Sequence, residues 1–178
     1  MGGNPVAMDR FAADPPVEKR LGDRLREAGA TVSIVEGCTG GLVSTLLTSV
    51  PGASEFLRRT VVPYSYDQLR FTLGVTREAL DEHGAVSEPV VVQSAKRARD
   101  LTDADWGVAT TGIAGPGGGS DDKPVGTGIV GIARASPWGS EASTAEAIRF
   151  EFDGDRAAVR ERLARAALST LLDRVEDQ

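Results

Sequence analysis

The spacing of hydrophobic residues predicts helices that alternate with strands in the first part of the chain. Apolar residues recur at helical intervals over 17–28, with charged residues on the other face, and Gly29 ends this helix. The β-branched run at 31–35 predicts a short buried strand. After a turn at Gly40 and Gly41, the apolar residues of 42–50 predict a second helix.

The middle of the chain predicts a second strand and three helices. Residues 60–65 form a strand-like run, and its internal Pro63 favours an edge position or a strand end because proline donates no hydrogen bond to a neighbouring strand. Two short helices, at 67–74 and 76–84, each end in a glycine. The third helix begins with Ser87, Glu88 and Pro89, a typical start, and should continue to about Leu101.

The last third of the chain predicts three strands, at 106–113, 127–135 and 144–152, of which the last two form a hairpin. A long loop at 115–126 follows the first of them, and a closing amphipathic helix covers 155–175. This alternation indicates an α/β fold with helices on both faces of a mixed sheet. We expect a disordered leader at 1–16 and one domain at 17–175.

Composition narrows the classes of function. The 178 residues carry a net charge of −6, which argues against a nucleic-acid partner because such proteins need a basic face. Only three of the 20 basic residues are lysine, a bias that fits either a high-salt cytoplasm or a GC-rich genome. Cys38 is the only cysteine, and no apolar run is long enough to span a membrane. We therefore expect a cytoplasmic protein with no membrane partner.

The turn after the first strand is the first candidate site. The backbone amides of Cys38, Thr39, Gly40 and Gly41 lie near the start of a helix, where free amides and the helix dipole favour an anion. Thr39 would either cap the helix or contact a ligand. The alternative is an ordinary strand-to-helix connection in which the glycines serve only the turn.

The glycine-rich loop after the strand at 106–113 is the second candidate site. Ligands of α/β proteins gather at the carboxyl ends of strands, glycines allow close approach of the backbone, and a loop of this length is usually either functional or disordered. The candidate ligand-binding residues of this region are Thr111, Gly112, Gly115, Gly117, Gly118 and Lys123.

Two other patterns carry no site. Gly126, Gly128 and Gly131 match a dinucleotide-binding spacing, but they lie within a predicted strand with no helix starting there. His83 is the only histidine, and its place at a helix end favours a capping or polar contact. One histidine and one cysteine do not make a zinc site without carboxylates, so we expect no metal.

Several longer segments together resemble one known family. They are VEGCTGGLVSTLLTSVPGASEF, VVPYS, LGV, HGAVSEPVV, TGIAGPGGG and KPVGT, in that order. They are similar to the C-terminal domain of the competence-damage protein CinA, which also exists as a stand-alone nicotinamide-nucleotide amidase. The resemblance covers about residues 17–175. It implies a single three-layer α/β/α domain with a mixed sheet, the hydrolysis of nicotinamide mononucleotide to nicotinate mononucleotide and ammonia, and no cofactor. Self-association of related domains also implies a homodimer.

The resemblance implies a serine nucleophile activated by a lysine base, with a tyrosine nearby. This chain keeps the tyrosine as Tyr64, but has Gly37 at the serine position and Leu69 at the lysine position. Cys38 and Thr39 are substitute nucleophiles to consider, although cysteine also follows the serine in the family's motif. Ser65 offers a further hydroxyl.

Three functions therefore stay open. The first is an impaired family member that still binds a mononucleotide through Thr39, Gly40, Gly41, Tyr64 and the glycine loop. The second is an active amidase or related hydrolase that uses substitute residues. The third is a structural or partner-binding domain. The intact glycine loop favours the first two, because a decayed pocket has no evident need for it.

Overall fold

The computed structural model describes residues 10–177 and contains one mixed five-stranded sheet. The strands follow the spatial order β2-β1-β3-β4-β5. Their bounds are β1 Val32–Glu36, β2 Leu57–Val61, β3 Trp106–Gly112, β4 Thr127–Arg134 and β5 Thr144–Glu151. β1 pairs in parallel with both β2 and β3, whereas β3, β4 and β5 pair antiparallel. The predicted mixed sheet and the predicted hairpin are therefore confirmed.

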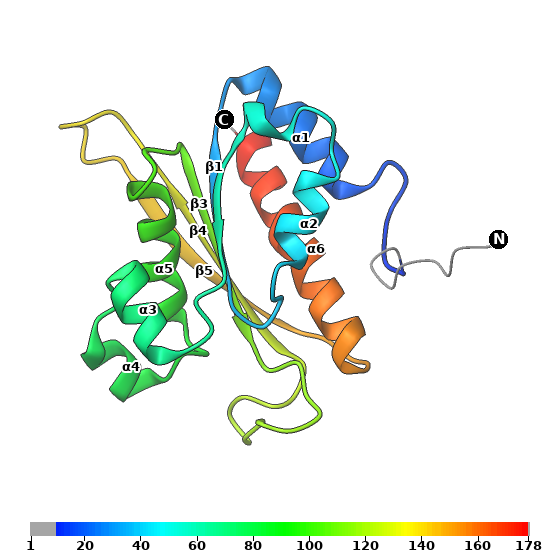
Figure 1. The fold of residues 1–178 in the computed structure, drawn as a ribbon, viewed down its shortest axis with the longest axis vertical. Helices are drawn as coiled ribbons and strands as arrows, with labels where there is room; N and C mark the ends of the chain where they lie inside the picture. Colours follow the sequence, from blue (N-terminus) through cyan, green and yellow to red (C-terminus); the bar gives the residue numbers. More distant parts are fainter. Residues whose placement is uncertain (1–9, 178) are drawn as a thin grey trace.

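Six α-helices cover the two faces of the sheet (Figure 1). α3, α4 and α5 lie on one face, and α1, α2 and α6 lie on the other. Their bounds are α1 Val17–Ala28, α2 Leu42–Thr48, α3 Tyr66–Leu73, α4 Arg77–His83, α5 Glu88–Asp100 and α6 Arg156–Glu176. Each lies within about two residues of the predicted helix, and the three-layer α/β/α architecture is confirmed. Among the helices of the described chain, none combines the length and apolarity that crossing a bilayer requires.

The second strand is the one element that the sequence pattern misplaces. It was expected at 60–65, but β2 ends at Val61. Pro63 lies beyond this end, because a residue without an N–H group cannot continue the pairing. The expected edge position is confirmed, since β2 pairs only with β1 among the described strands. The residues after β2 are therefore free to turn across the carboxyl end of the sheet.

Two apolar cores hold the layers together, one on each face of the sheet. α6 supplies the larger core, in which Leu163, Leu168 and Leu171 are completely buried. α5 packs on the other face through Val91 and Ala95. Burial of this apolar surface is the main force that fixes the two helices against the sheet.

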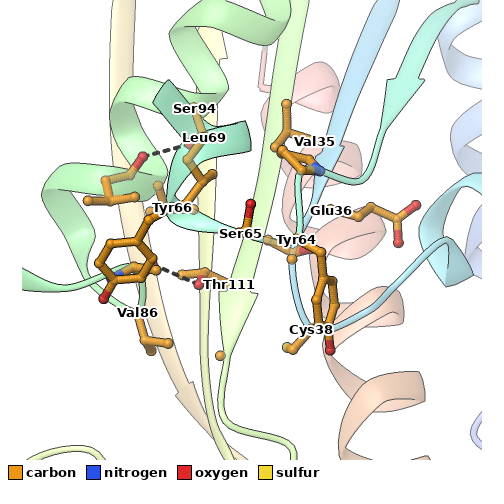
Figure 2. A pocket seen from close by; sticks show the side chains of 17 residues that line it. Val35, Glu36, Cys38, Tyr64, Ser65, Tyr66, Leu69, Val86, Ser94 and Thr111 are labelled. Atoms are coloured by element: carbon orange, nitrogen blue, oxygen red, sulfur yellow. Dashed lines mark hydrogen bonds between the residues drawn. The ribbon is translucent and has the colours of Figure 1, made fainter. Parts of the chain in front are cut away.

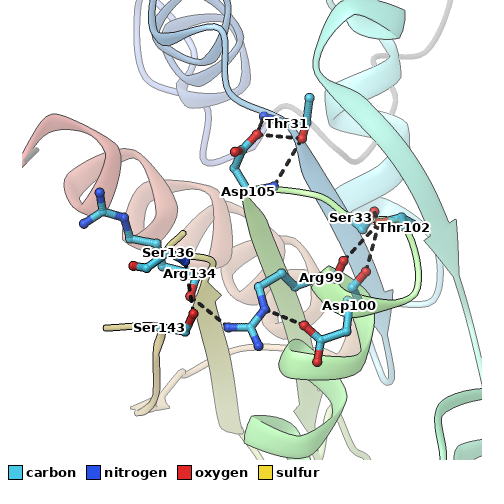
Figure 3. A network of polar contacts seen from close by, with 10 residues as sticks. Thr31, Ser33, Arg99, Asp100, Thr102, Asp105, Arg134, Ser136 and Ser143 are labelled. Carbon is cyan, nitrogen blue, oxygen red and sulfur yellow. Dashed lines mark hydrogen bonds and ion pairs between the residues drawn. The ribbon is translucent and has the colours of Figure 1, made fainter. Parts of the chain in front are cut away.

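A polar network lies at the end of the sheet where β1 and β3 begin, opposite their carboxyl ends (Figure 3). The backbone N–H and the hydroxyl of Thr31 both donate to Asp105, each at 2.8 Å. Ser33 and Thr102 share a hydrogen bond of 2.7 Å, and Arg99 donates to the carbonyl of Arg134. These contacts join the starts of β1 and β3, so the two strands reach the other end of the sheet in fixed register.

Residues 10–16 of the expected leader are described by the structure, whereas residues 1–9 lie outside the described part. The backbone N–H of Phe11 donates to Glu161 at 3.0 Å. Arg162 stacks on the ring of Phe11, with 4.4 Å between its guanidinium carbon and the ring centroid. Phe11 thus rests on the amino-terminal half of α6.

We predict that Gly107→Ala destabilises the domain. A Cβ atom at Gly107 would overlap the carbonyl oxygen of Ala95, so α5 would have to move away from β3. Overpacking of this kind typically costs about 1–3 kcal/mol of unfolding free energy. Gly117→Ala is the matched control because a Cβ there meets no atom within 4 Å. Urea unfolding measures both, and equal stability of the two variants would contradict the packing described here.

Candidate functional site

A cavity of about 240 Å³ lies at the carboxyl ends of β1, β2 and β3 (Figure 2). Its walls come from the turn after β1, the segment after β2, the end of β3 and the facing side of α5. The lining residues are Val35, Glu36, Gly37, Cys38, Pro63, Tyr64, Ser65, Tyr66, Leu69, Ala85, Val86, Val90, Val91, Ser94, Thr110, Thr111 and Gly112. The site therefore brings together the two positions that the family resemblance singles out, Gly37 and Leu69.

The carboxylate of Glu36 organises the turn after β1. It is completely buried and accepts hydrogen bonds from the backbone N–H groups of Gly41, Val43 and Ser44 at 2.8–3.1 Å. The Ser44 hydroxyl donates to it as well. Negative charge at the start of a helix is favourable because the first amides have no partner within the helix. Figure 2 shows the Glu36 side chain directed away from the cavity, toward α2.

This arrangement leaves fewer free amides for an anionic ligand at the turn than the sequence predicts. Of the amides expected to bind a ligand, that of Gly41 is bonded to Glu36 and that of Gly40 is bonded to the carbonyl of Gly37. The protein's own carboxylate therefore occupies the start of α2. A carboxylate at the end of a buried strand, directly before a glycine turn and a helix, is the signal in the sequence that identifies such an internal cap.

Arg160 of α6 holds the same turn from the opposite side. Its guanidinium group donates to the carbonyl of Cys38 at 3.0 Å and to the carbonyl of Thr39 at 2.8 Å. Arg156, one helical turn earlier, donates to the carbonyl of Gly115 at 2.7 Å. The two arginines thus join the turn after β1 and the glycine loop to the same helix. Neither residue was identified from the sequence, because about 120 residues separate Arg160 from the turn.

At Gly37, the position where the family resemblance implies a serine, the backbone lies close against β3. The N–H of Gly37 donates to the carbonyl of Thr110 at 2.8 Å. A Cβ atom at Gly37 would also lie 2.8 Å from that carbonyl oxygen, closer than side-chain carbons approach a backbone atom. Any side chain at this position requires the turn to shift away from β3.

The substitute nucleophiles are poorly placed for chemistry. Burial raises the pKa of the Cys38 thiol to about 11, although Arg160 and Arg156 act in the opposite direction. Thr39 is completely buried and shares a hydrogen bond of 2.7 Å with Thr110, so it does not line the cavity. Ser65 lines the cavity, but its hydroxyl caps α3 by accepting from the N–H of Gln68.

Two tyrosines stand on either side of the cavity. Tyr64 extends beside Cys38 in Figure 2, and two thirds of its surface is exposed. Tyr66 lies toward Val86, and its hydroxyl accepts a hydrogen bond of 3.2 Å from the N–H of Ala85. Tyr66 thereby joins the start of α3 to the segment before α5. Sequence analysis did not identify Tyr66, and an aromatic residue two positions after Tyr64 is only a weak signal.

The glycine loop contributes less to the cavity than expected. Thr111 and Gly112 line it, whereas Gly115, Gly117, Gly118 and Lys123 do not. Gly117 and Gly118 are exposed. The ammonium group of Lys123 instead donates to the backbone carbonyl of His83, at the end of α4, at 2.8 Å. The described residues contain no group of His, Cys, Asp and Glu side chains that is placed to hold a metal ion.

Comparison with known proteins agrees with this architecture. A model of the CinA C-terminal domain matches residues 14–175. The nicotinamide-nucleotide amidohydrolase PncC of Escherichia coli K12 is 43% identical over 155 residues, which cover 87% of this chain and 90% of that protein. The CinA-like protein of Chlorobaculum tepidum is 44% identical over 161 residues, or 90% of this chain, and the chain spans 38% of that relative's length.

Solved structures show the same fold. The competence/damage inducible protein CihA from Agrobacterium tumefaciens superimposes with a TM-score of 0.82 at 33% identity, covering 97% of this chain and 98% of that one. A CinA superfamily protein from Klebsiella pneumoniae superimposes with a TM-score of 0.83 at 30% identity, covering 91% of this chain and 97% of that one.

We predict that Glu36→Gln destabilises the domain by about 1.5–3 kcal/mol, the range for hydrogen bonds to a charged group. The substitution removes the charge and turns N–H donors toward the amides of α2. Ser44→Ala is the control, because it leaves the carboxylate bonded to its three amides. Chemical denaturation compares the two variants, and the account of the turn fails if Glu36→Gln is as stable as Ser44→Ala.

Because the pKa of Cys38 is raised to about 11, the thiol should stay protonated at neutral pH. Iodoacetamide should modify folded protein at pH 8 on the order of 100-fold more slowly than urea-unfolded protein, whose cysteine has an ordinary pKa near 8.5. The rate for folded protein should keep rising beyond pH 9. A rate that levels off between pH 7 and 8 would show a reactive thiolate instead.

Proposed function

Because the chain belongs to the CinA C-terminal domain family, we propose that it binds nicotinamide mononucleotide, or a closely similar nucleotide, in this cavity and hydrolyses its amide slowly or not at all. One observation carries the proposal: Gly37 and Leu69, which replace the family's serine and lysine, line the same cavity at the carboxyl ends of the parallel strands. The site keeps its location and loses both reacting groups.

The charge around the cavity favours a nucleotide ligand. Arg156 and Arg160 both act electrostatically on Cys38, which lies at one end of the lining. Their guanidinium groups provide positive charge for a phosphate at that end, since arginine donors suit phosphate oxygens. The opposite part of the cavity, around Leu69 and Val90, is apolar and suits a flat ring. Tyr64, the residue retained from the family's motif, offers an exposed aromatic face beside Cys38.

The two other functions receive less support. An active hydrolase needs a nucleophile with a base in contact, and the thiol of Cys38 is held in its protonated form by burial. The hydroxyl of Thr39 is buried away from the cavity. A purely structural domain gives no reason for a cavity lined by Thr111, Gly112 and Tyr64. A homodimer and a cytoplasmic location belong to the proposal as further expectations, the first from the resemblance and the second from the cysteine content.

The test combines titration calorimetry with an assay of ammonia release from nicotinamide mononucleotide. We expect saturable binding by the wild-type chain and little or no ammonia. Gly37→Ser combined with Leu69→Lys should raise the rate, and neither single change should do so, because the two groups act as one unit. The gain should be partial, since a side chain at Gly37 pushes against the carbonyl of Thr110.

Three results would change this proposal. Efficient turnover by the wild-type chain that Cys38→Ala abolishes would identify Cys38 as the nucleophile and refute catalytic impairment. Efficient turnover that is insensitive to Cys38→Ala would point to Ser65. An absence of binding to any mononucleotide would support the structural alternative.

A further inference from the structure

The cavity presents an uncharged inner wall where the family's lysine would stand. None of its lining residues is lysine, arginine or histidine. Leu69 takes the place of the lysine, and Val35, Val90 and Val91 of the same lining are each at most 3% exposed. A negative charge brought to this wall would lose its hydration without meeting a positive partner, and that loss is costly.

Two hydroxyl groups of the lining, those of Ser94 and Thr111, already donate their protons within the protein. Ser94 donates to the carbonyl of Val90 at 2.8 Å, and Thr111 donates to the carbonyl of Ala85 at 2.9 Å. Each hydroxyl oxygen therefore offers a ligand only lone pairs, which accept hydrogen bonds. A carboxamide NH₂ group carries two donors that suit these oxygens, whereas an ionised carboxylate carries none.

We infer that this cavity distinguishes the amide form of a pyridine mononucleotide from its acid form and retains the amide, with Leu69 as the residue that determines the preference. The inference rests on the proposed function, because it concerns the ligand of the same site. Nicotinamide and nicotinate mononucleotides share their ring, ribose and phosphate. Their difference in affinity therefore isolates the carboxamide from the carboxylate.

A lysine at position 69 would reverse the preference of the cavity for the amide. Its ammonium group would attract a carboxylate and hold the acid in the site. The apolar wall formed with Leu69 instead makes the acid a poor ligand. The fraction of this protein that carries bound ligand would then follow the concentration of the amide. The protein would not consume the amide, and the acid formed by its hydrolysis would not block the site.

The test is calorimetric titration of the wild-type chain with each mononucleotide at pH 7, with the ligand checked for intact amide afterwards. We expect nicotinamide mononucleotide to bind at least about tenfold more tightly, a difference of about 1.4 kcal/mol. Leu69→Lys should abolish or invert this preference. Leu69→Met is the matched control, because it changes the shape of the side chain without adding charge, and it should keep the preference.

The outcomes separate the two proposals. If neither mononucleotide binds, the proposed function fails, and the inference fails with it. If both bind with equal affinity, the proposed function stands and the inference is overturned. Thr111→Val provides a second route should Leu69→Lys not fold: it removes an acceptor near the wall, and it should weaken binding of the amide severalfold while leaving the weak binding of the acid unchanged. Equal weakening of both ligands by Thr111→Val would contradict the role assigned to the hydroxyl oxygens.

Discussion

The buried carboxylate of Glu36 is the contact on which the site depends. It stands at the end of β1 and accepts three backbone N–H groups from the start of α2, so the turn between them has one favourable path. Arg160 donates hydrogen bonds to two backbone carbonyls on the outer side of that turn. Because a buried charge is tolerated only with such partners, the position of Gly37 and Cys38 against β3 follows from the capping of Glu36.

The same turn shows how the structure accommodates a glycine at position 37. With no side chain at Gly37, the backbone lies directly against the carbonyl of Thr110. Across the cavity, Leu69 joins an apolar wall rather than leaving a gap. The packing on both sides of the cavity thus fits a glycine at position 37 and a leucine at position 69. Arg156 and Arg160 place positive charge beside Cys38, where they contact the loop and the turn.

Local pattern in the sequence was sufficient for most of the fold. The bounds of α1, α3 and α6 follow from apolar spacing and from capping residues, and the β4–β5 hairpin follows from its alternation and its turn. The shift of β2 to 57–61 escaped the pattern because Arg58 and Arg59 face outward at the sheet edge, without the apolar alternation of a typical strand.

The site was less predictable than the fold, because its key contacts join distant parts of the chain. Motif positions placed Gly37, Tyr64, Leu69 and Thr111 at one cavity, and the structure brings them together. Thr39 and Lys123 were also expected there, yet Thr39 turns into the core and Lys123 reaches the carbonyl of His83. No local pattern contains the information that decides these directions, since each partner lies at least 40 residues away.

The most direct test of this account is a crystal structure of the wild-type chain soaked with nicotinamide mononucleotide. The account predicts an intact carboxamide against Leu69, close to Thr111, with the phosphate toward Arg156 and Arg160. A ligand bound elsewhere on the molecule, or nicotinate mononucleotide found in the cavity after the soak, would contradict it.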